Sequence, residues 1–304
     1  MTETFGPYAL ELKNLDKVLY PDSGITKGDV IDYYRRIADL MVPWLKGRVL
    51  TMQRFPDGIH AEGFFQKNMP AYFPDWFTRR TVEVSDGKQQ VPVCNNLASL
   101  VYVANQGSIT QHVWLSRLDR IHHPDQMIFD LDPPGDDFEP VRRGARDCLE
   151  LLEELSLAAG IKTTGSRGLH VVTPLRRQHD FDAVRAFARD CARLLVARYP
   201  DRYTIEQRID RREGKLYLDV QRNAYGQTAV APFSLRAADG APVATPIPRR
   251  TLDDPGLNSR SYRLDNIHRF LGQIGDPWNG LRRHASGLAP ARRKLDSLLA
   301  LASV

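Results

Sequence analysis

The 304-residue sequence contains only three cysteines, and no two of them form a Cys-X-X-Cys pair. An odd number of widely spaced cysteines in apolar surroundings argues against both a disulfide framework and a zinc site. The sequence also lacks a run of about 18 apolar residues, so no transmembrane helix is expected. Its first residues lack the basic and apolar stretches of a secretory signal. These absences predict a cytoplasmic protein with reduced cysteines and no membrane partner.

Lysine is scarce as well, with 9 lysines against 33 arginines, and the formal net charge is +5. The charge is uneven: residues 1–200 carry 25 basic and 26 acidic side chains, whereas residues 201–304 carry 17 and 11. A basic carboxyl-terminal part permits binding to a polyanion. An arginine-rich but ordinary surface explains the same numbers. The 42% hydrophobic and 26% charged content excludes wholesale disorder and a fibrous protein.

Apolar periodicity predicts helices and strands that alternate along the chain, without an internal repeat. Thr26 is the expected N-cap of a first helix. The clearest expected helices cover residues 27–41, 138–159 (closed by Gly160) and 181–199, and the clearest strands cover 126–132 and 215–221. After about residue 240, proline and turn residues predict a segment that wraps over the core, with an irregular tail after 270.

The sharpest local feature is Phe129-Asp130-Leu131-Asp132 at the end of the strand at 126–132. Residues i and i+2 of a strand point to the same face, so Asp130 and Asp132 project together, away from the apolar face of Phe129 and Leu131. Two carboxylates about 6–7 Å apart repel each other unless a cation lies between them, and a hard divalent cation is the usual solution. The alternative is a pair of solvated acids at a strand end.

A second strand carries a third carboxylate. Alternation in Lys215-Leu216-Tyr217-Leu218-Asp219 places Asp219 on the face opposite to its two leucines. If this strand neighbours the strand at 126–132, three carboxylates meet at one point. Two Mg²⁺ or Mn²⁺ ions held there could activate a hydroxyl nucleophile and neutralise a leaving phosphate.

Between these strands lies the glycine-rich turn Gly165-Ser166-Arg167-Gly168-Leu169-His170. Glycines let the backbone approach a phosphate, and Ser166, Arg167 and His170 supply donors to its oxygens. The segment matches neither a Walker A loop nor a Gly-X-Gly-X-X-Gly element. An ordinary hairpin turn with an incidental histidine is the competing interpretation.

The order of these three segments resembles the archaeo-eukaryotic primase superfamily, and within it the polymerase domain of the bacterial non-homologous end-joining ligase D family. Further segments resemble the same family in the same order, and the resemblance covers roughly residues 10–270. These segments are Asn14–Pro21, Thr26–Asp29, Arg54–Gly58, Gly63–Lys67, Gln111–Arg117 and Ala231–Arg236. No Lys-X-Asp-Gly ligase nucleophile motif occurs, so the sequence is either a stand-alone polymerase module, which we expect, or a fragment of a longer chain.

The resemblance implies an α+β fold, in which a primase-polymerase core of antiparallel and mixed sheets, with an RRM-like catalytic sheet, is flanked by helices. We expect a single catalytic domain over residues 1–304. Its first part, about 1–120, would hold the 5′-phosphate and base-stacking elements. The catalytic sheet and helices would follow at about 121–238, and the wrapping segment at about 239–304.

The resemblance also implies a role for each matching residue. The metal-binding and catalytic residues would be Asp130, Asp132 and Asp219. The nucleotide would be bound by Phe64 or its neighbour Phe65, His112, Ser166, His170 and Arg236. The 5′-phosphate on the far side of a DNA gap would be bound by Asn14, Lys17, Lys27 and Arg54. Without the resemblance, the aromatic pair is equally a core pair, His112 a structural histidine, and the lysines solvated surface residues.

The implied function is metal-dependent addition of nucleotides, preferably ribonucleotides, to 3′ ends at gaps or double-strand breaks during DNA repair. The implied cofactors are two Mn²⁺ or Mg²⁺ ions. The implied partners are gapped or broken DNA with a 5′-phosphate, nucleoside triphosphates, Ku and a separate DNA ligase. A cytoplasmic, nucleoid-associated location follows from the same resemblance.

Three other functions remain open at this point. A primase that starts chains without a primer would use the same carboxylates, although a 5′-phosphate pocket favours gap filling. A non-catalytic module that binds DNA ends would use the basic carboxyl-terminal part and would not need Asp219. A metal-dependent nuclease also uses clustered acids, but it would need no triphosphate pocket.

Overall fold

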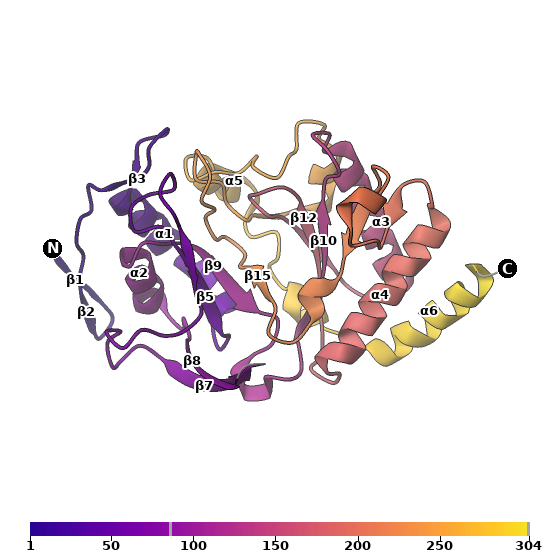
Figure 1. The fold of residues 1–304 in the computed structure, drawn as a ribbon, viewed down its shortest axis with the longest axis horizontal. Helices are drawn as coiled ribbons and strands as arrows, with labels where there is room; N and C mark the ends of the chain where they lie inside the picture. Colours follow the sequence, from indigo (N-terminus) through magenta and orange to yellow (C-terminus); the bar gives the residue numbers. More distant parts are fainter. Residues whose placement is uncertain (85–86, 303–304) are drawn as a thin grey trace. The chain divides into compact units, whose positions relative to one another are not determined.

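The structure, a computed structural model, describes residues 1–84 and 87–302, which form two compact units (Figure 1). Unit 1 consists of Met1–Asp119, Thr228–Thr245 and Tyr262–Gly275. Unit 2 consists of Arg120–Gln227, Pro246–Ser261 and the segment from Asp276 onward. Residues after 227 therefore alternate between the two units, and the expected three-part division of a single domain stays a prediction.

Unit 1 is built on a four-stranded antiparallel sheet with two helices. The sheet has the order β15 (Thr228–Val230), β9 (Ser108–Trp114), β5 (Leu50–Arg54) and β6 (Phe64–Gln66). Helices α1 (Lys27–Leu45) and α2 (Leu97–Asn105) pack against each other, and Figure 1 shows them beside β5 and β9. The sheet thus carries the segments around Phe64 and His112 that the sequence singled out.

Three small antiparallel ladders and a short helix complete unit 1. The ladders are β1 (Thr2–Phe5) with β2 (Tyr8–Glu11), β3 (Val18–Tyr20) with β4 (Ile25–Thr26), and β7 (Arg79–Val84) with β8 (Gly87–Pro92). The short helix is α5 (Ile267–Ile274).

Helix α1 begins where its sequence predicts. The Thr26 hydroxyl accepts a hydrogen bond from the Asp29 backbone N–H at 3.2 Å, and the Asp29 carboxylate accepts one from the Thr26 N–H at 2.8 Å. This reciprocal capping box satisfies two backbone donors of the first turn. The helix continues to Leu45, four residues beyond the predicted end, because Trp44 and Leu45 extend its buried apolar stripe past Pro43.

Unit 2 is built on a six-stranded mixed sheet. Its order is β13 (Tyr203–Thr204), β14 (Leu216–Asp219), β10 (Gln126–Asp132), β12 (Leu169–Pro174), β11 (Gly160–Thr163) and β16 (Pro246–Ile247). All neighbours are antiparallel except β13 and β14. Across the described residues, the 3₁₀ helices are η1 (Leu118–Arg120), η2 (Ile209–Arg211), η3 (Gln221–Asn223), η4 (Arg249–Asp253) and η5 (Leu281–His284).

Helix α3 (Glu139–Glu154) packs on one face of this sheet and leaves the other face to the acidic residues. Gly144 of α3 lies so close to the Leu216 side chain that any added methyl group would overlap it, and Leu131 is the next neighbour on the sheet. Because residues alternate along a strand, Asp130 and Asp219 point to the opposite face. The other helices of unit 2 are α4 (Phe181–Arg198), which contacts α3 and β10, and α6 (Leu288–Ala302), which packs on α4.

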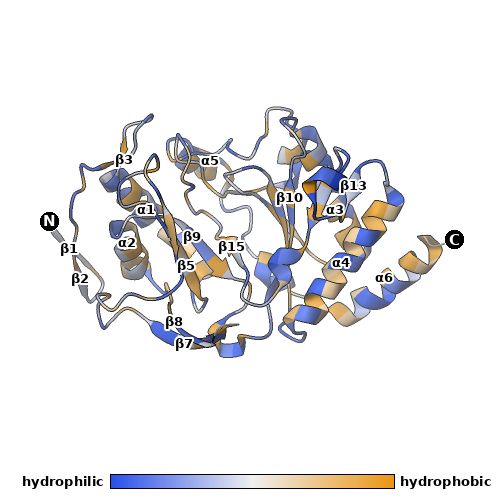
Figure 2. Cartoon of the chain, viewed as in Figure 1, coloured by the Kyte–Doolittle hydropathy of each residue, from blue (hydrophilic) through white to orange (hydrophobic). Residues whose placement is uncertain are grey.

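Two expectations about helix ends are wrong. The helix predicted over 138–159 ends at Glu154, because Ser156 adopts a left-handed backbone conformation with φ of 59°, and Gly160 begins β11 instead of closing the helix. The tail after 270 is not irregular, because α6 forms and buries Leu295. Figure 2 shows apolar and polar residues interleaved along α6, as in an amphipathic helix.

The class of the fold is the predicted α+β class, with helices around antiparallel and mixed sheets. Cys94, Cys148 and Cys191 are buried and free, and burial raises the pKa of each thiol well above its usual range. They are therefore core residues with unreactive thiols. Over the described residues, every helix is too short or too polar to cross a lipid bilayer.

Candidate active site

Strand pairing in unit 2 brings the three predicted carboxylates to one place. Strands β10 and β14 are antiparallel neighbours, with Asp130 directly opposite Asp219 and Asp132 opposite Tyr217. Side chains of directly opposite residues have Cβ atoms about 4.5–5.5 Å apart. Asp132 lies two residues along β10 on the same face. The condition set from the sequence, that the two strands are neighbours, is therefore met, and the three carboxylates share one face of the sheet.

Asp130 is the most buried of the three and has two partners. Its carboxylate accepts a hydrogen bond from Arg222 Nε at 3.1 Å, and His170 Nε2 lies 3.3 Å from its other oxygen. His170 comes from β12, where it stands opposite Asp130 in the sheet. Arg222 comes from η3, which directly follows β14. The sequence reasoning did not identify Arg222, although its position three residues after Asp219 in the chain was a usable signal.

At neutral pH, Arg222 is the cation that keeps Asp130 ionised. Burial would raise the pKa of Asp130, but His170 and Arg222 lower it, and the result is a pKa well below the usual range. Lys162 stands opposite His170 on the neighbouring strand β11. Burial, together with the ammonium of Lys162, lowers the pKa of His170 to about 4. His170 is then uncharged near pH 7, so the compensating charge comes from Arg222.

Asp132 and Asp219 are shifted in the opposite direction. Asp132 is exposed at the end of β10, but partial desolvation of its carboxyl group and the charge of Asp130 raise its pKa to about 6. Partial burial and Asp130 also raise the pKa of Asp219, although the Gln221 backbone N–H donates to this carboxylate at 2.7 Å. Negative charge is therefore crowded on this face, and a cation would relieve it.

The chemistry of these residues fits a hard divalent cation. Three carboxylates offer oxygen donors, which Mg²⁺ and Mn²⁺ prefer. Within residues 1–84 and 87–302, no three His, Cys, Asp or Glu side chains already converge as metal ligands. Instead, the Arg222 guanidinium donates a hydrogen bond to the Asp130 carboxylate. The residues that would hold the ions are Asp130, Asp132 and Asp219.

The glycine-rich turn packs against the end of the acidic strand. A Cβ added to Gly168 would overlap the backbone carbonyl of Leu131 and lie 2.7 Å from Asp132 Oδ1. The Thr164 hydroxyl donates to the Gly168 carbonyl at 3.0 Å and accepts from the Gly168 N–H at 3.1 Å. Gly165 has φ of 66°, which favours glycine. Thr164, which the sequence reasoning missed, thus holds the turn closed beside Asp132.

Ser166 lies at the tip of this turn and His170 lies inside the sheet. The Ser166 hydroxyl makes no hydrogen bond with any described residue, and the Ser166 carbonyl accepts from Ser259 at 2.8 Å and from Arg260 at 3.2 Å. His170 is only 3% exposed. The structure thus places the two predicted triphosphate contacts on one strand–turn element but gives them different surroundings.

In unit 1, the aromatic pair is on the surface. Phe64 is 46% exposed and Phe65 is 56% exposed, so neither is a core residue. The Arg54 guanidinium lies 5.4 Å from the Phe64 ring centre and donates to Gln66 and to the Tyr72 hydroxyl. The Phe65 ring meets the His112 ring edge-on at 5.6 Å. Phe64, Phe65 and His112 therefore form one aromatic patch with Arg54.

Asn14, Lys17 and Lys27 form a separate group in unit 1. The Lys17 N–H donates to the Asn14 carbonyl at 3.1 Å, and the Lys27 N–H donates to the Lys17 carbonyl at 2.8 Å. The Lys27 ammonium donates to the Lys13 carbonyl at 2.7 Å, and burial together with Lys17 lowers its pKa. No hydrogen bond or ion pair in the described chain joins Arg54 to this group. The structure thus assembles three of the four predicted 5′-phosphate residues and places Arg54 with the aromatic patch.

Arg236 is held by its backbone in unit 1. Its carbonyl accepts from the buried Tyr20 hydroxyl at 3.0 Å, and its N–H donates to the Pro242 carbonyl at 2.7 Å.

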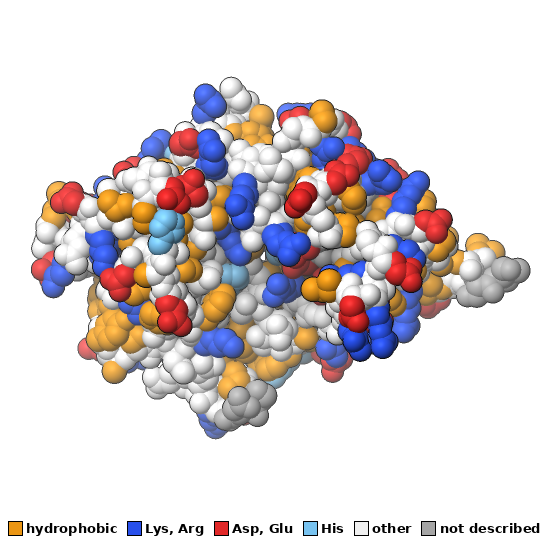
Figure 3. Space-filling view, turned by 45° about the horizontal axis from the view of Figure 1, so that its top comes forward, with side chains coloured by type: hydrophobic (Ala, Val, Ile, Leu, Met, Phe, Trp, Pro, Cys, Tyr) orange, Lys and Arg blue, Asp and Glu red, His pale blue; other side chains and the backbone are white. Residues whose placement is uncertain are grey.

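The exposed charge of the chain shows no single-signed field on the face drawn in Figure 3, where basic and acidic side chains intermingle. On this face, the uneven charge along the sequence therefore does not identify a binding surface by itself.

Residues 26–278 match the family described as the LigD primase-polymerase domain. Multifunctional non-homologous end joining protein LigD of Mycolicibacterium smegmatis is 35% identical over 275 residues, which is 88% of this chain and 35% of the relative. Bifunctional LigD of Bacillus subtilis is 32% identical over 271 residues, 88% of this chain and 43% of the relative. The chain thus spans about a third to two fifths of the length of these relatives.

A solved structure agrees with the sequence matches. The polymerase domain of Mycobacterium tuberculosis ligase D in complex with DNA is similar with a TM-score of 0.86 and 31% identity, over 91% of this chain and 99% of that one. This likeness confirms the predicted primase-polymerase fold. Because the family match also covers most of the residues, the chain belongs to the LigD primase-polymerase domain family.

Proposed function

We propose that this protein is a metal-dependent nucleotidyltransferase that adds nucleotides, preferably ribonucleotides, to the 3′ ends of DNA strands. The observation that carries the proposal is the register of β10 and β14, which sets Asp130 opposite Asp219 and keeps Asp132 on the same face. Three crowded carboxylates beside a glycine-rich turn match the needs of phosphoryl transfer, in which positioning and charge neutralisation dominate.

Asp130, Asp132 and Asp219 would hold two Mn²⁺ or Mg²⁺ ions, which supply a lower pKa for a 3′-hydroxyl and a counter-charge for the triphosphate. His170, neutral near pH 7, would donate a hydrogen bond to a phosphate oxygen. Ser166, whose hydroxyl is unpaired within the described chain, would donate a second. The attacking 3′-oxygen forms a bond to the α-phosphorus, and pyrophosphate leaves with the electrons of the broken bond.

Residues of unit 1 carry the other nucleotide-binding roles that the family motifs assign. The exposed rings of Phe64 and Phe65 are suited to stacking on a base, and such stacking is worth about 1–3 kcal/mol per base. His112, edge-on to Phe65, would contact the sugar and read a 2′-hydroxyl. The Arg236 side chain would provide a further phosphate contact. These assignments follow the family motifs, residue by residue.

The DNA substrate that we propose is a gap or a break with a 5′-phosphate. Asn14, Lys17 and Lys27 would bind that phosphate, because two ammonium groups are held close together there and one of them is buried. Arg54 would contact DNA from the aromatic patch. The similar solved structure is a polymerase domain in complex with DNA, which supports a DNA substrate.

The proposed cellular role is gap filling during non-homologous end joining, with Ku and a separate DNA ligase as partners, in the cytoplasm at the nucleoid. The support is the name of the relatives, which describes them as end-joining proteins. The chain covers only part of those relatives, so ligation would come from another polypeptide or from a further segment.

The test is primer extension on gapped DNA that carries a 5′-phosphate, with Mn²⁺ and either ribonucleotides or deoxyribonucleotides. We expect extension by the wild type, faster with ribonucleotides and slower without the 5′-phosphate, and none by Asp130→Ala. Asp136→Ala, a change of an exposed acid in the loop after β10, is the matched control and should extend normally.

Three outcomes would redirect the proposal. Tight DNA binding without extension, equal in the wild type and in Asp130→Ala, would support a non-catalytic module that binds DNA ends. Synthesis on a template without any primer would support a primase. Degradation of the DNA by the wild type alone would support a nuclease.

A further inference from the structure

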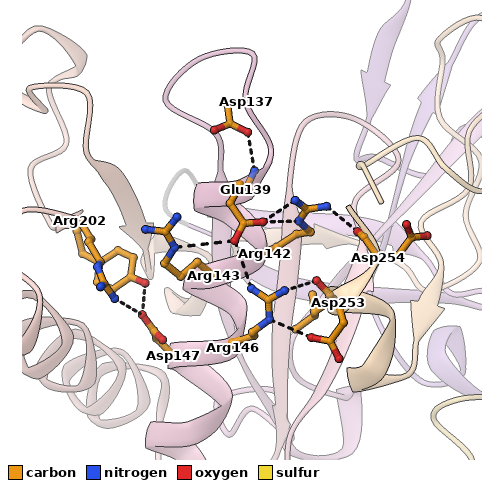
Figure 4. Close-up of polar contacts among 11 residues, drawn as sticks. Asp137, Glu139, Arg142, Arg143, Arg146, Asp147, Arg202, Asp253 and Asp254 are labelled. Carbon is orange, nitrogen blue, oxygen red and sulfur yellow. Dashed lines mark hydrogen bonds and ion pairs between the residues drawn. The ribbon is translucent and has the colours of Figure 1, made fainter. Parts of the chain in front are cut away.

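Residues 249–261, which we call the strap, are distant in sequence from the glycine-rich turn but contact it within unit 2. Two arginines of α3 hold the strap, as Figure 4 shows. Arg142 Nη1 donates to the Asp254 carbonyl at 2.6 Å, and Arg146 Nε lies 3.4 Å from Asp253 Oδ1. Arg146 also donates to the Leu252 carbonyl, and the Leu252 side chain is buried. Contacts with α3 therefore hold the strap within unit 2.

The end of the strap closes on the turn. Ser259 Oγ and Arg260 Nε both donate to the carbonyl of Ser166, at 2.8 Å and 3.2 Å. Asn258 Oδ1 accepts from the Arg260 backbone N–H at 2.9 Å, so the backbone of Arg260 is held as well. One carbonyl at the tip of the turn thus receives two donors from residues more than 90 positions away in the chain.

The guanidinium of Arg260 has N–H donors that no described residue accepts. Its two terminal nitrogens make no hydrogen bond or ion pair with any described residue, and the side chain is exposed. A guanidinium has five N–H donors, of which the contact with Ser166 uses one. Arg167, the next residue along the turn, is also exposed, and among the described residues its side chain donates only to the Pro133 carbonyl, at 3.3 Å. Two arginines thus flank Ser166.

This pattern suits a chain of phosphates. Planar guanidinium groups bind phosphate oxygens through paired N–H donors, and the glycine backbone permits close approach. Asp132 adjoins the same turn at Gly168, so phosphates bound at the turn would lie close to the carboxylates. A single phosphate could not use both arginines and the carboxylate site as fully as a longer polyphosphate could.

We infer that Arg260 is a further triphosphate-binding residue, which contacts the outer phosphates of a nucleotide held at the Gly165–Gly168 turn. This inference rests on the proposed function and deepens it, because it assigns part of the triphosphate to a residue outside the family motifs. Arg260 would favour nucleoside triphosphates over monophosphates. Ser259, by contrast, would only position the turn.

The experiment is calorimetric titration of the intact chain with a nucleoside triphosphate, diphosphate and monophosphate in the presence of Mn²⁺. The variants are Arg260→Ala, Arg260→Lys and the matched control Arg250→Ala, which removes an exposed arginine of η4 in the same unit. We expect Arg260→Ala to weaken triphosphate binding about tenfold, as for one lost charge-assisted hydrogen bond. Monophosphate binding should change less than about twofold, and Arg260→Lys should fall between.

Three results would overturn the inference. Equal weakening for all three nucleotides, reproduced by Ser259→Ala, would show that Arg260 only braces the turn. Triphosphate binding by Arg260→Ala that equals binding by Arg250→Ala would remove Arg260 from the site and leave the proposed function intact. A wild type that binds no triphosphate and extends no primer would overturn both proposals together. Thermal melting of each variant confirms that the protein tested is folded.

Discussion

Two charged regions of this molecule are organised in different ways. The carboxylate face of unit 2, formed by Asp130, Asp132 and Asp219, sits on paired strands, and its central member is 6% exposed. The lysine pair of unit 1, Lys17 and Lys27, is held by backbone hydrogen bonds of loops and by a helix start. Regular strand pairing therefore determines the first geometry, whereas local turns determine the second.

Both regions contain a counterion from the protein itself. Arg222 pairs with Asp130 at 3.1 Å, and Asp57 pairs with Lys17 at 2.6 Å. Asp57 is 72% exposed in its side chain, so solvent screens that pair and it contributes little stability. Asp130 is buried, so loss of its partner would leave an uncompensated charge, which costs much more. Burial, rather than the distance between the charged atoms, therefore determines how much each ion pair contributes to stability.

The largest effect should come from breaking the carboxylate face. Asp219→Asn keeps the shape of the side chain and removes its charge opposite Asp130. We expect the extension rate to fall about 10²- to 10⁴-fold, equivalent to several kcal/mol of lost charge stabilisation. Single-turnover primer extension measures the rate, and DNA affinity should stay within about twofold. A variant that extends at the wild-type rate would remove Asp219 from the catalytic set.

The next largest effect concerns the packing that supports the same face. Gly168→Ala would drive a methyl group into the Leu131 carbonyl, which is backbone and cannot move aside cheaply. Overpacking of about 1–3 kcal/mol should lower the melting temperature by about 3–10 °C. Gly135→Ala is the matched control, because its Cβ would meet nothing within 4 Å. Equal melting temperatures for both variants would contradict the close approach of the turn to β10.

Substitutions at the lysine pair and at its counterion should have smaller effects, which act in opposite directions. Lys17→Gln removes an ammonium and should weaken the preference for 5′-phosphorylated over unphosphorylated gapped DNA about tenfold. Asp57→Asn removes the competing carboxylate and should strengthen that preference by about twofold, as expected for an exposed pair. Fluorescence anisotropy with the two DNAs measures both. Changes in the same direction would show that Asp57 supports the pocket rather than competing in it.

The smallest effect should be a pH dependence from the carboxylate face. The pKa of Asp132 is about 6 in the fold and is 3.8 ordinarily, so between these values the folded state binds more protons than the unfolded state. Stability of the metal-free protein should therefore fall as pH rises from about 4 to 6. Asp132→Asn should remove this part of the slope, whereas the low pKa of His170 gives an opposite slope in both proteins.

Denaturant melts of the two proteins at several pH values isolate the contribution of Asp132 as a difference. Because Asp132 is exposed at the end of β10, solvent moderates the effect, and the difference in slope should be shallow. Identical pH profiles for the wild type and Asp132→Asn would show that the carboxylates are less crowded than their strand register implies.

Much of the local structure followed from patterns within one segment. The capping box of α1 was predictable because Thr26 and Asp29 are three residues apart. The shared face of Asp130 and Asp132 was predictable because strand residues alternate. The end of α3 was not predictable, because apolar periodicity does not indicate that Ser156 adopts a left-handed backbone conformation.

The sites were predictable to the extent that they lie in single motifs. Asp130, Asp132, Asp219 and the glycine-rich turn were identified from strand alternation and family resemblance. Arg222, Thr164 and Arg260 were missed. Thr164 and Arg222 lie beside the motifs, but hydroxyl and guanidinium groups are common there. Arg260 gave no local signal, since the feature that defines it is a contact with Ser166 across the chain.

The sequence alone determined that the segments around Asp130 and Asp219 form strands and which face of each carries charge, because those properties depend on neighbours two to four positions away. It also determined the family, through several motifs in a constant order. Only the tertiary structure decided that Asp130 faces Asp219, that Arg222 compensates Asp130, and that the strap closes on Ser166. These contacts join distant segments, and strand register and burial, which no local pattern encodes, select them.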